Sequence, residues 1–343
     1  MRSEQVLPST NKSHRLGFGC PAEFCALRVQ LANGFRLFGA PALFGGSHSG
    51  CVRLIGEMAI KLLALDLDGT LLTSHGQISQ VNRRAIDEAR RRGVHVVLAT
   101  GRRFRDARPV ALDLDLGDAP IIAHNGALTK HARTATTVAA RLLPLEAAHA
   151  VLRVGRACGA DAMVSDDPHG AGLLVYERAS EGNRELARYI EWSRRVAGTE
   201  SEVLAVPSLI DYLDHDPVHI AFAGGCATMN DLGRVLAAEL NGRVRIVRTF
   251  YTKKDFALLD IISPQASKGA GLAAVAAEYG VAREEVMAIG DNFNDLEMLE
   301  FAGTSVVMSN AEADLSRGRP FHSTASNDED GVALAIERFI LND

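Results

Sequence analysis

The chain has 343 residues, of which 47% are apolar and 23% charged, and its formal net charge is −5. Such a chain is long and apolar enough to bury the cores of about two domains, which excludes a disordered or fibrous protein. The small negative charge argues against general nucleic-acid binding, and no apolar run has the length of a membrane helix. The five cysteines are irregularly spaced, without a C-x-x-C pair, and indicate free thiols in a reducing, cytoplasmic environment.

The segment before Met58 lacks the periodicity of a folded domain. Residues 1–57 carry three more basic than acidic residues and three of the five cysteines. They show no sustained spacing of apolar residues typical of a helix or a strand. A G-x-x-x-x-G spacing at 45–50 is followed by Cys51 and Val52, so the Lys and Ser or Thr of a phosphate loop are missing. We expect residues 1–57 to be a disordered or dispensable extension, or an upstream start.

From Met58 onward, short apolar runs alternate with helical patterns, which is typical of a doubly wound parallel sheet in an α/β fold. The expected strands are continuous apolar runs and lie at 59–65, 94–99, 120–123, 286–289 and 305–308. Ser79 and Ser267 are suited to begin helices that Gly93 and Gly280 end. Further helices are expected at 294–303 and 332–341.

The middle of the chain has a different pattern, because several strands follow one another directly. Helices are expected at 145–157, 183–196 and 228–240, and strands near 162–164, 173–177, 218–222 and 244–247. This pattern predicts an α+β domain inserted into the first domain, after which residues 256–262 lead back into the parallel sheet. We assign residues 58–143 and 257–343 to the core and residues 144–256 to the inserted domain.

Acidic residues follow two of the expected strands at the points where these strands end. Asp66 and Asp68 come directly after the first strand, and Asp291 and Asp295 follow a strand near the C-terminus. In a doubly wound sheet the site lies at the carboxyl ends of the strands. Paired acids in an apolar context repel one another unless a cation or a reaction requires them. Mg²⁺ is the natural partner, because it binds carboxylates together with phosphate oxygens.

Two further residues extend this set toward phosphoryl transfer. Lys268 supplies a fixed positive charge and Asn294 a donor, both suited to holding an anion. In such a reaction one carboxylate attacks phosphorus, while the metal and the lysine spread the charge on the other phosphate oxygens. The second acid of the first pair can protonate the leaving oxygen and later activate water.

Four segments of the chain resemble, in order, the motifs of the haloacid dehalogenase (HAD) superfamily. They are Asp66-Leu67-Asp68-Gly69-Thr70-Leu71-Leu72 for motif I, Thr100-Gly101-Arg102 for motif II, Ser267-Lys268-Gly269 for motif III and Gly290-Asp291-Asn292-Phe293-Asn294-Asp295 for motif IV. The segment Asn125-Gly126-Ala127 and the large insertion between motifs II and III are similar to Cof-type phosphatases with a type IIB cap. The resemblance covers about residues 58–341 and implies a Rossmann-like core, with the inserted domain as its cap.

The resemblance also implies a role for each matching residue. Asp66 would be the nucleophile and a ligand of Mg²⁺, and Asp68 the general acid and base that also binds Mg²⁺ through its backbone carbonyl. Asp291 would be the third protein ligand of the metal, with Asp295 beside it. The phosphate would be held by the side chains of Thr100, Lys268 and Asn294 and by the backbone N–H groups of Leu67 and Gly101.

These inferences predict Mg²⁺-dependent hydrolysis of a small phosphomonoester, such as a sugar phosphate, through an aspartyl-phosphate intermediate. Two alternatives use the same residues: a phosphotransferase or phosphomutase, and a non-catalytic regulatory protein that binds a phosphate ligand. The expected partner is a small-molecule phosphate ester and not a nucleic acid or a membrane. The sequence does not indicate an oligomeric state. We further expect Arg102, Arg103 and Arg105 to form a solvated helix start, and His124 to be a structural histidine with its hydrogen bonds satisfied.

Overall fold

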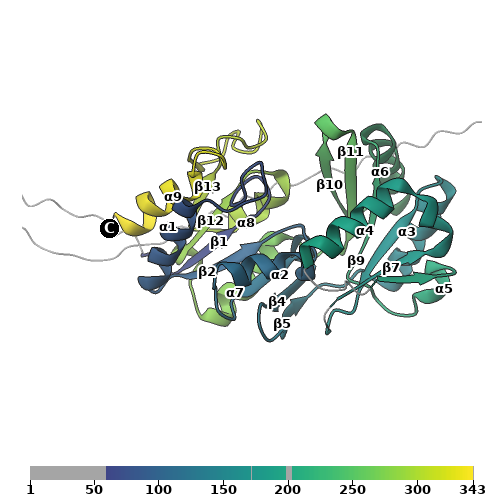
Figure 1. Cartoon of the computed structure of the whole chain (residues 1–343), viewed down its shortest axis with the longest axis horizontal. Coiled ribbons are helices and arrows are strands. Elements are labelled where there is room, and N and C mark those ends of the chain that lie inside the picture. Colours follow the sequence, from purple (N-terminus) through teal and green to yellow (C-terminus); the bar gives the residue numbers. More distant parts are fainter. Residues whose placement is uncertain (1–58, 171, 198–202, 343) are drawn as a thin grey trace, which may run out of the picture. The chain divides into compact units, whose positions relative to one another are not determined.

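The computed structural model describes residues 59–170, 172–197 and 203–342. The prediction for residues 1–57 therefore lies outside the described residues. The described residues form two β-sheets with helices against both (Figure 1), and all strands of the second sheet lie between β5 and β12 in the chain. The predicted α/β class, with a mainly parallel sheet and an inserted α+β segment, is confirmed.

The first sheet has eight strands in the order β14-β13-β12-β1-β2-β3-β4-β5. Its strands are β1 (Leu62–Leu65), β2 (His95–Ala99), β3 (Pro120–Ala123), β4 (Leu128–His131), β5 (Thr137–Ala140), β12 (Val286–Gly290), β13 (Thr304–Val307) and β14 (His322–Ser323). Neighbouring strands from β14 to β3 are parallel, whereas β4 and β5 add antiparallel pairs. Strands β4 and β5 were not predicted, because they contain polar residues and are not continuous apolar runs.

Both faces of the first sheet are buried, as the apolar strands require. Leu63 and Leu65 belong to the core cluster that also contains side chains of α1, α2 and α9, whereas Leu62 and Ala64 belong to the cluster with α7 and α8. These helices are α1 (Gln80–Arg91), α2 (Phe104–Asp113), α7 (Lys268–Tyr279), α8 (Leu296–Phe301) and α9 (Gly331–Ile336). The sheet is therefore doubly wound, and its strand ends are the expected place for a site.

Two of the predicted helix starts and one predicted end are visible as capping contacts. The Ser79 hydroxyl accepts the N–H of Asn82 at the start of α1, and the Ser267 hydroxyl accepts the N–H of Ala270 at the start of α7, both at 3.0 Å. Gly280 ends α7 with a left-handed φ of 64°. The cap at Ser267 matters for the site, because it places Lys268 at the first position of the helix.

The second sheet has six strands in the order β10-β11-β9-β6-β7-β8. Its strands are β6 (Ala162–Asp166), β7 (Leu173–Glu177), β8 (Val203–Val206), β9 (His219–Gly224), β10 (Arg245–Tyr251) and β11 (Phe256–Ile262). Neighbours pair antiparallel except for β7 and β8. Its helices are α3 (Leu145–Ala157), α4 (Arg184–Ala197), α5 (Leu209–Tyr212) and α6 (Cys226–Leu240). One core cluster joins the sheet to α3 and α6, and another joins it to α4.

The prediction that residues 256–262 lead back into the parallel sheet is wrong. This segment is β11, which pairs antiparallel with both β9 and β10 in the second sheet. Ala257, Leu259 and Ile261 are buried in the core of that sheet, and Ile262 alone belongs to the first core. Residues 257–262 were assigned to the core domain, but they form the last strand of the inserted segment.

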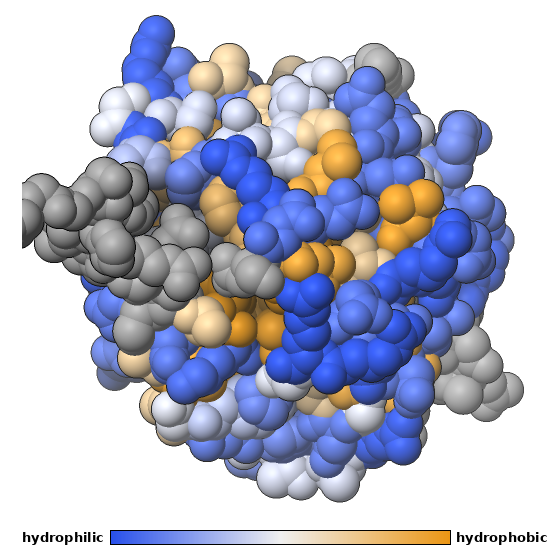
Figure 2. Space-filling model, turned by 90° about the vertical axis from the view of Figure 1, so that its left-hand side faces the viewer, coloured by the Kyte–Doolittle hydropathy of each residue, from blue (hydrophilic) through white to orange (hydrophobic). Residues whose placement is uncertain are grey.

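Figure 2 shows one face of the molecule, on which hydrophilic side chains predominate and hydrophobic ones form separate patches. The exposed large apolar side chains of the described residues lie on several elements: Val81, Leu112, Leu204, Val235, Phe250, Tyr251, Phe293 and Leu334. Scattered apolar side chains of this kind are ordinary on a water-facing surface. Of the helices in the described part of the chain, none combines the length and the apolar character needed to cross a membrane.

Candidate active site

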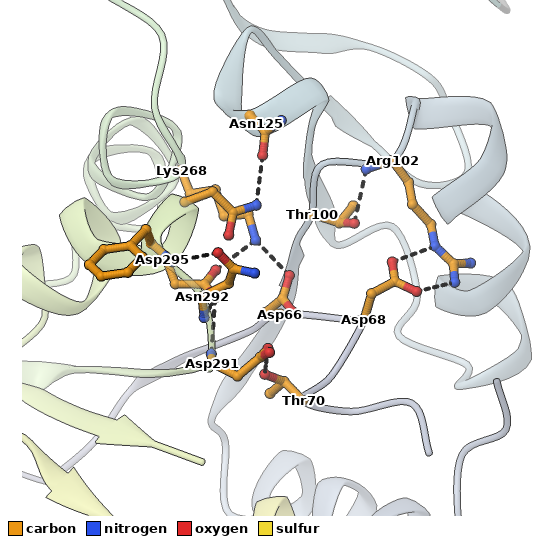
Figure 3. A network of polar contacts seen from close by, with 12 residues as sticks. Asp66, Asp68, Thr70, Thr100, Arg102, Asn125, Lys268, Asp291, Asn292 and Asp295 are labelled. Atoms are coloured by element: carbon orange, nitrogen blue, oxygen red, sulfur yellow. Dashed lines mark hydrogen bonds and ion pairs between the residues drawn. The ribbon is translucent and has the colours of Figure 1, made fainter. Parts of the chain in front are cut away.

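Acidic residues follow the neighbouring strands β1 and β12 and lie close together at the carboxyl ends of these strands. Leu65 pairs with Ile289 across the two strands, and the N–H of Asp66 donates to the Ile289 carbonyl at 3.1 Å. A 3₁₀ turn after β12 then brings Asp295 back toward Asp291. Carboxylate oxygens of Asp66, Asp291 and Asp295 all lie within 4.8 Å of one another (Figure 3).

Lys268 lies between two of these carboxylates. Its Nζ donates to Asp66 Oδ1 and to Asp295 Oδ1, both at 2.6 Å, and its side chain is fully buried. Burial alone would lower the pKa of the Lys268 ammonium, but Asp295 and Asp66 raise it above its ordinary value. Lys268 is therefore charged, and it fixes the two carboxylates relative to each other.

The cluster of Asp66, Asp291 and Asp295 still carries more negative than positive charge. Burial raises the pKa of Asp66 well above its ordinary value, although Lys268 opposes this shift. Burial and the charge of Asp295 raise the pKa of Asp291 to about 6. Among the salt bridges of the described residues, Lys268 contacts Asp66 and Asp295, and no cation contacts Asp291. The set therefore fits a divalent cation such as Mg²⁺, which prefers carboxylate oxygens and would offset the remaining charge.

The three acids of the cluster have different amounts of free oxygen. Asp295 uses both of its oxygens, because Oδ1 accepts from Lys268 and Oδ2 accepts the N–H groups of Asp291 and Asn292, each at 3.0 Å. Asp291 Oδ1 accepts the hydroxyl of Thr70 at 2.7 Å. Asp66 and Asp291 are thus better placed than Asp295 to hold a metal, and Asp295 positions the loop that carries Asp291.

The structure does not bring the Asp68 carboxylate to the other three acids. Figure 3 shows Asp68 turned toward Arg102, whose Nε and Nη2 donate to its two oxygens at 2.7 and 2.6 Å. The Asp68 side chain is 48% exposed, so it faces the open side of the site. This position suits an acid and base for the leaving group. The predicted metal contact of Asp68 concerns its backbone carbonyl and stays a prediction.

The expectation of a solvated arginine cluster is wrong for two of the three arginines. Arg102 forms the ion pair with Asp68, and its guanidinium carbon lies 5.6 Å from the centre of the Trp192 ring. Arg103 is buried and donates to Asp106 and to the Ser193 hydroxyl of α4. The helix start itself is confirmed, because α2 begins directly after Arg103.

The predicted phosphate-binding groups lie around the cluster. Among the described residues, the backbone N–H groups of Leu67 and Gly101 have no hydrogen-bond partner, so both are available to an anion. The Thr100 hydroxyl accepts the N–H of Arg102 at 3.1 Å and keeps its own proton to donate. Asn294 donates to Asn125 Oδ1 at 2.9 Å through Nδ2, which retains a second N–H. These positions are compatible with the predicted roles but do not test them.

Glycine is required at one position of this site. Gly69 has a φ of 93°, and a β-carbon there would lie 2.4 Å from Asp291 Oδ2. The turn after Asp68 therefore passes directly against the acid that follows β12.

Sequence reasoning assigned no role to several residues that the structure places here. Thr70 and Asn125 lie within the segments that resemble family motifs, so the sequence already indicated that they are near the site. Asp260 gave no signal, because β11 was assigned to the wrong sheet. His124 is a satisfied buried histidine as predicted: its Nε2 accepts the N–H of Phe104 at 3.2 Å, and its Nδ1 lies 2.7 Å from Nδ1 of His219.

Asp260 gives a testable pH dependence of stability. Burial raises its pKa to about 7, so the folded protein holds this proton where the unfolded chain has released it. The stabilising contribution of the group is complete below the unfolded pKa of about 4 and falls by about 1.4 kcal/mol for each pH unit up to about 7. Asp260→Asn, which cannot ionise, should gain stability relative to the wild type between pH 4 and 7. Urea unfolding at several pH values checks this, and parallel pH profiles of the two proteins would contradict it.

Comparisons with known proteins place the chain in a family. A model described as haloacid dehalogenase-like hydrolase matches residues 63–336. The putative phosphatase YxeH of Bacillus subtilis (strain 168) is 31% identical over 286 residues, which are 82% of this chain and 98% of the relative. The 5-amino-6-(5-phospho-D-ribitylamino)uracil phosphatase YwtE of the same organism is 29% identical over 290 residues, with coverage of 82% and 98%. The chain belongs to the haloacid dehalogenase-like hydrolase family.

A solved structure supports the same assignment. A haloacid dehalogenase-like hydrolase from Bacteroides thetaiotaomicron matches with a TM-score of 0.67 and 26% identity, over 81% of this chain and 99% of that one. The predictions of the superfamily, of its fold and of an enzyme of the phosphatase class are thereby confirmed.

Proposed function

We propose that this enzyme hydrolyses small phosphomonoesters in a Mg²⁺-dependent reaction that passes through a phosphorylated Asp66. One observation carries the proposal. Two buried carboxylates, Asp66 and Asp291, follow adjacent parallel strands and lie beside a buried Lys268, while Asp68 stands apart on the open side. A pure binding site has no use for an anionic nucleophile at the place where a phosphate would bind, so this arrangement favours catalysis over the regulatory alternative.

In the first step, a carboxylate oxygen of Asp66 forms a bond to phosphorus, and the bond from phosphorus to the leaving oxygen breaks. The electron pair goes to the leaving oxygen, which takes a proton from Asp68. Lys268, Thr100, Asn294 and the backbone N–H groups of Leu67 and Gly101 hold the remaining phosphate oxygens. When bound by Asp66 and Asp291, Mg²⁺ would supply positive charge that neutralises the phosphate and the carboxylates.

In the second step, Asp68 removes a proton from water, whose oxygen attacks phosphorus and releases Asp66 and inorganic phosphate. This exchange of roles needs an acid that reaches solvent, and the 48% exposed side chain of Asp68 meets that need. Asp68 must be protonated for the first step, so its ion pair with Arg102 has to loosen when the substrate is bound. The inserted domain would cover the site and select the leaving group.

We further propose that the protein is located in the cytoplasm. Among the described residues, Cys158 and Cys226 are free thiols, which suits a protein of the reducing cytoplasm.

Product analysis tests the proposed reaction against phosphoryl transfer to another acceptor. The protein is incubated with Mg²⁺ and an aryl phosphate or a panel of metabolite phosphates, with and without a sugar as acceptor. We expect inorganic phosphate to account for all of the phosphoryl group released. Transfer to the sugar hydroxyl would support a phosphotransferase, and the absence of turnover with every substrate would contradict the proposal.

A further inference from the structure

The turn between β3 and β4 has an unusual backbone. His124, Asn125 and Gly126 have φ values of 51°, 54° and 88°, so three successive residues are left-handed and two of them are not glycine. Such conformations persist where surrounding contacts impose them, which is common at functional sites. The turn also lies against the loop that leads into α7, because a β-carbon on Gly126 would lie 1.9 Å from the Ser267 carbonyl oxygen.

The side chain of Asn125 joins three parts of the molecule. It is 3% exposed, and its Oδ1 accepts from Asn294 Nδ2 at 2.9 Å. Its Nδ2 donates to Asp260 Oδ2 on β11 at 3.3 Å. A β-carbon on Gly101 would lie 3.1 Å from Asn125 Oδ1, and the backbone N–H of Asn125 donates to the Thr100 carbonyl. Asn125 therefore contacts the loop after β2, the loop after β12 and the second sheet at once.

Asp260 fastens this turn to the inserted segment. The side chain of Asp260 is 15% exposed, and its Oδ1 lies 3.7 Å from Nε2 of His219 on β9. His219 in turn contacts His124 at 2.7 Å. Two successive side chains of the turn, His124 and Asn125, are thus each tied to the second sheet. Their conformation depends on contacts with the inserted segment.

These contacts also fix the direction of the Asn294 amide. Because Nδ2 of Asn125 donates to Asp260, its Oδ1 faces Asn294. Asn294 must therefore donate to this oxygen through its own Nδ2. The Asn294 oxygen is buried and has no partner among the described residues. An amide with a buried, unpartnered oxygen and one free N–H can complete its hydrogen bonds by donating to a bound phosphate and accepting from a water molecule beside it.

We propose that Asn125 is a positioning residue for phosphoryl transfer, which orients Asn294 toward the bound phosphate, and that Asp260 anchors Asn125 from the inserted segment. The inference rests on the proposed function, because it assumes that Asn294 contacts the phosphate. Through Asp260, Asn125 and Asn294, the inserted segment thus helps to orient a phosphate-binding side chain. This role is separate from any contact that the segment makes with the leaving group.

The test uses the full chain and two readouts: kcat and KM for an aryl phosphate, and the Kd of inorganic phosphate by calorimetry. Asn125→Gly removes the side chain but tolerates the left-handed backbone. Asn125→Gly and Asp260→Ala should each weaken phosphate binding and raise KM by ~10-fold, the scale of one lost hydrogen bond to a charged or buried group. Asp260→Asn keeps an oxygen to which Asn125 can donate. In this variant the KM and the Kd of phosphate should therefore stay within about threefold of the wild-type values.

A double-mutant cycle shows whether Asn125 acts through Asn294. In the Asn294→Ala background, Asn125→Gly should cause little further loss, because the residue that it positions is already absent. Asp161→Asn is the matched control: this carboxylate bonds to Ser180 and Asn183 within the inserted segment, so both readouts should stay at wild-type values.

The possible outcomes separate this inference from the proposed function. If the wild type neither hydrolyses the aryl phosphate nor binds inorganic phosphate, the proposed function fails. If the wild type does both but Asn125→Gly changes neither KM nor Kd, or if its loss is undiminished in Asn294→Ala, the positioning role is overturned. Should Asp260→Ala not fold, the cycle of Asn125→Gly and Asn294→Ala still decides.

Discussion

Replacing Asp66 by Asn should lower kcat by at least ~10³-fold, the scale seen when a nucleophile or a main electrostatic stabiliser is lost. The substitution keeps the size of the side chain and removes the negative charge that attacks phosphorus. The measurement is the rate of aryl phosphate hydrolysis at saturating substrate and Mg²⁺. Turnover close to the wild type would contradict the mechanism, since the bond to phosphorus would then form without the Asp66 carboxylate.

The same variant should stay folded, which makes its loss of activity interpretable. Lys268 keeps its ion pair with Asp295, and one of three mutually repelling carboxylates is neutralised. A thermal melt should therefore show no loss of stability. Asp118→Asn is a suitable control: this acid binds the backbone N–H groups of Arg133 and Thr134 just before β3, away from the carboxyl ends of the strands. It should leave kcat unchanged.

Removal of divalent metal should abolish activity, and Mg²⁺ should restore it. Among the described residues, Lys268 forms ion pairs with Asp66 and Asp295 but not with Asp291, so the cluster of three acids has an excess of negative charge. Ca²⁺ should restore little activity, because it prefers more ligands at longer distances than Mg²⁺. The assay measures hydrolysis in excess EDTA and after addition of each metal.

A stability measurement supports the metal experiment without requiring turnover. Binding to the folded protein alone raises its melting temperature, so Mg²⁺ should stabilise the wild type. Asp291→Asn should show a smaller shift, because it removes one of the two carboxylates with free oxygen. Full activity in excess EDTA, or a shift that is equal in wild type and Asp291→Asn, would contradict the assignment of the metal site.

The parts of this structure that the sequence predicts are those set by neighbouring residues. Helix α7 is one example, because Ser267 caps its start, Gly280 ends it, and both signals lie within the segment itself. The meeting of Asp66 with Asp291 is another. It follows from two apolar strands that each end in an acid, together with the rule that sites of doubly wound sheets lie at the carboxyl ends of their strands.

The parts that could not be predicted depend on pairing and orientation over long distances. The apolar run of β11, in which Asp260 is the one polar residue, suits either sheet, and only its antiparallel pairing with β9 and β10 decides between them. Asp260 lies on that strand, so its contact with Asn125 was equally hidden. Arg103 looked like a surface residue because its partner Ser193 lies ninety positions further along the chain. The Asp68 side chain points toward Arg102 because the two residues form an ion pair, and a sequence motif does not reveal this pairing.

Trapping of the phosphorylated enzyme tests the central claim most directly. The protein is mixed with Mg²⁺ and an aryl phosphate, quenched in acid and treated with borohydride, which reduces an aspartyl phosphate to homoserine. Mass spectrometry of the peptide that contains Asp66 and Asp68, and of the peptide that contains Asp291, then locates the change. The account predicts homoserine at position 66 in the wild type and no reduction in Asp66→Asn. Hydrolysis that proceeds without modification of Asp66, or with modification of Asp68 or Asp291 in its place, would contradict it.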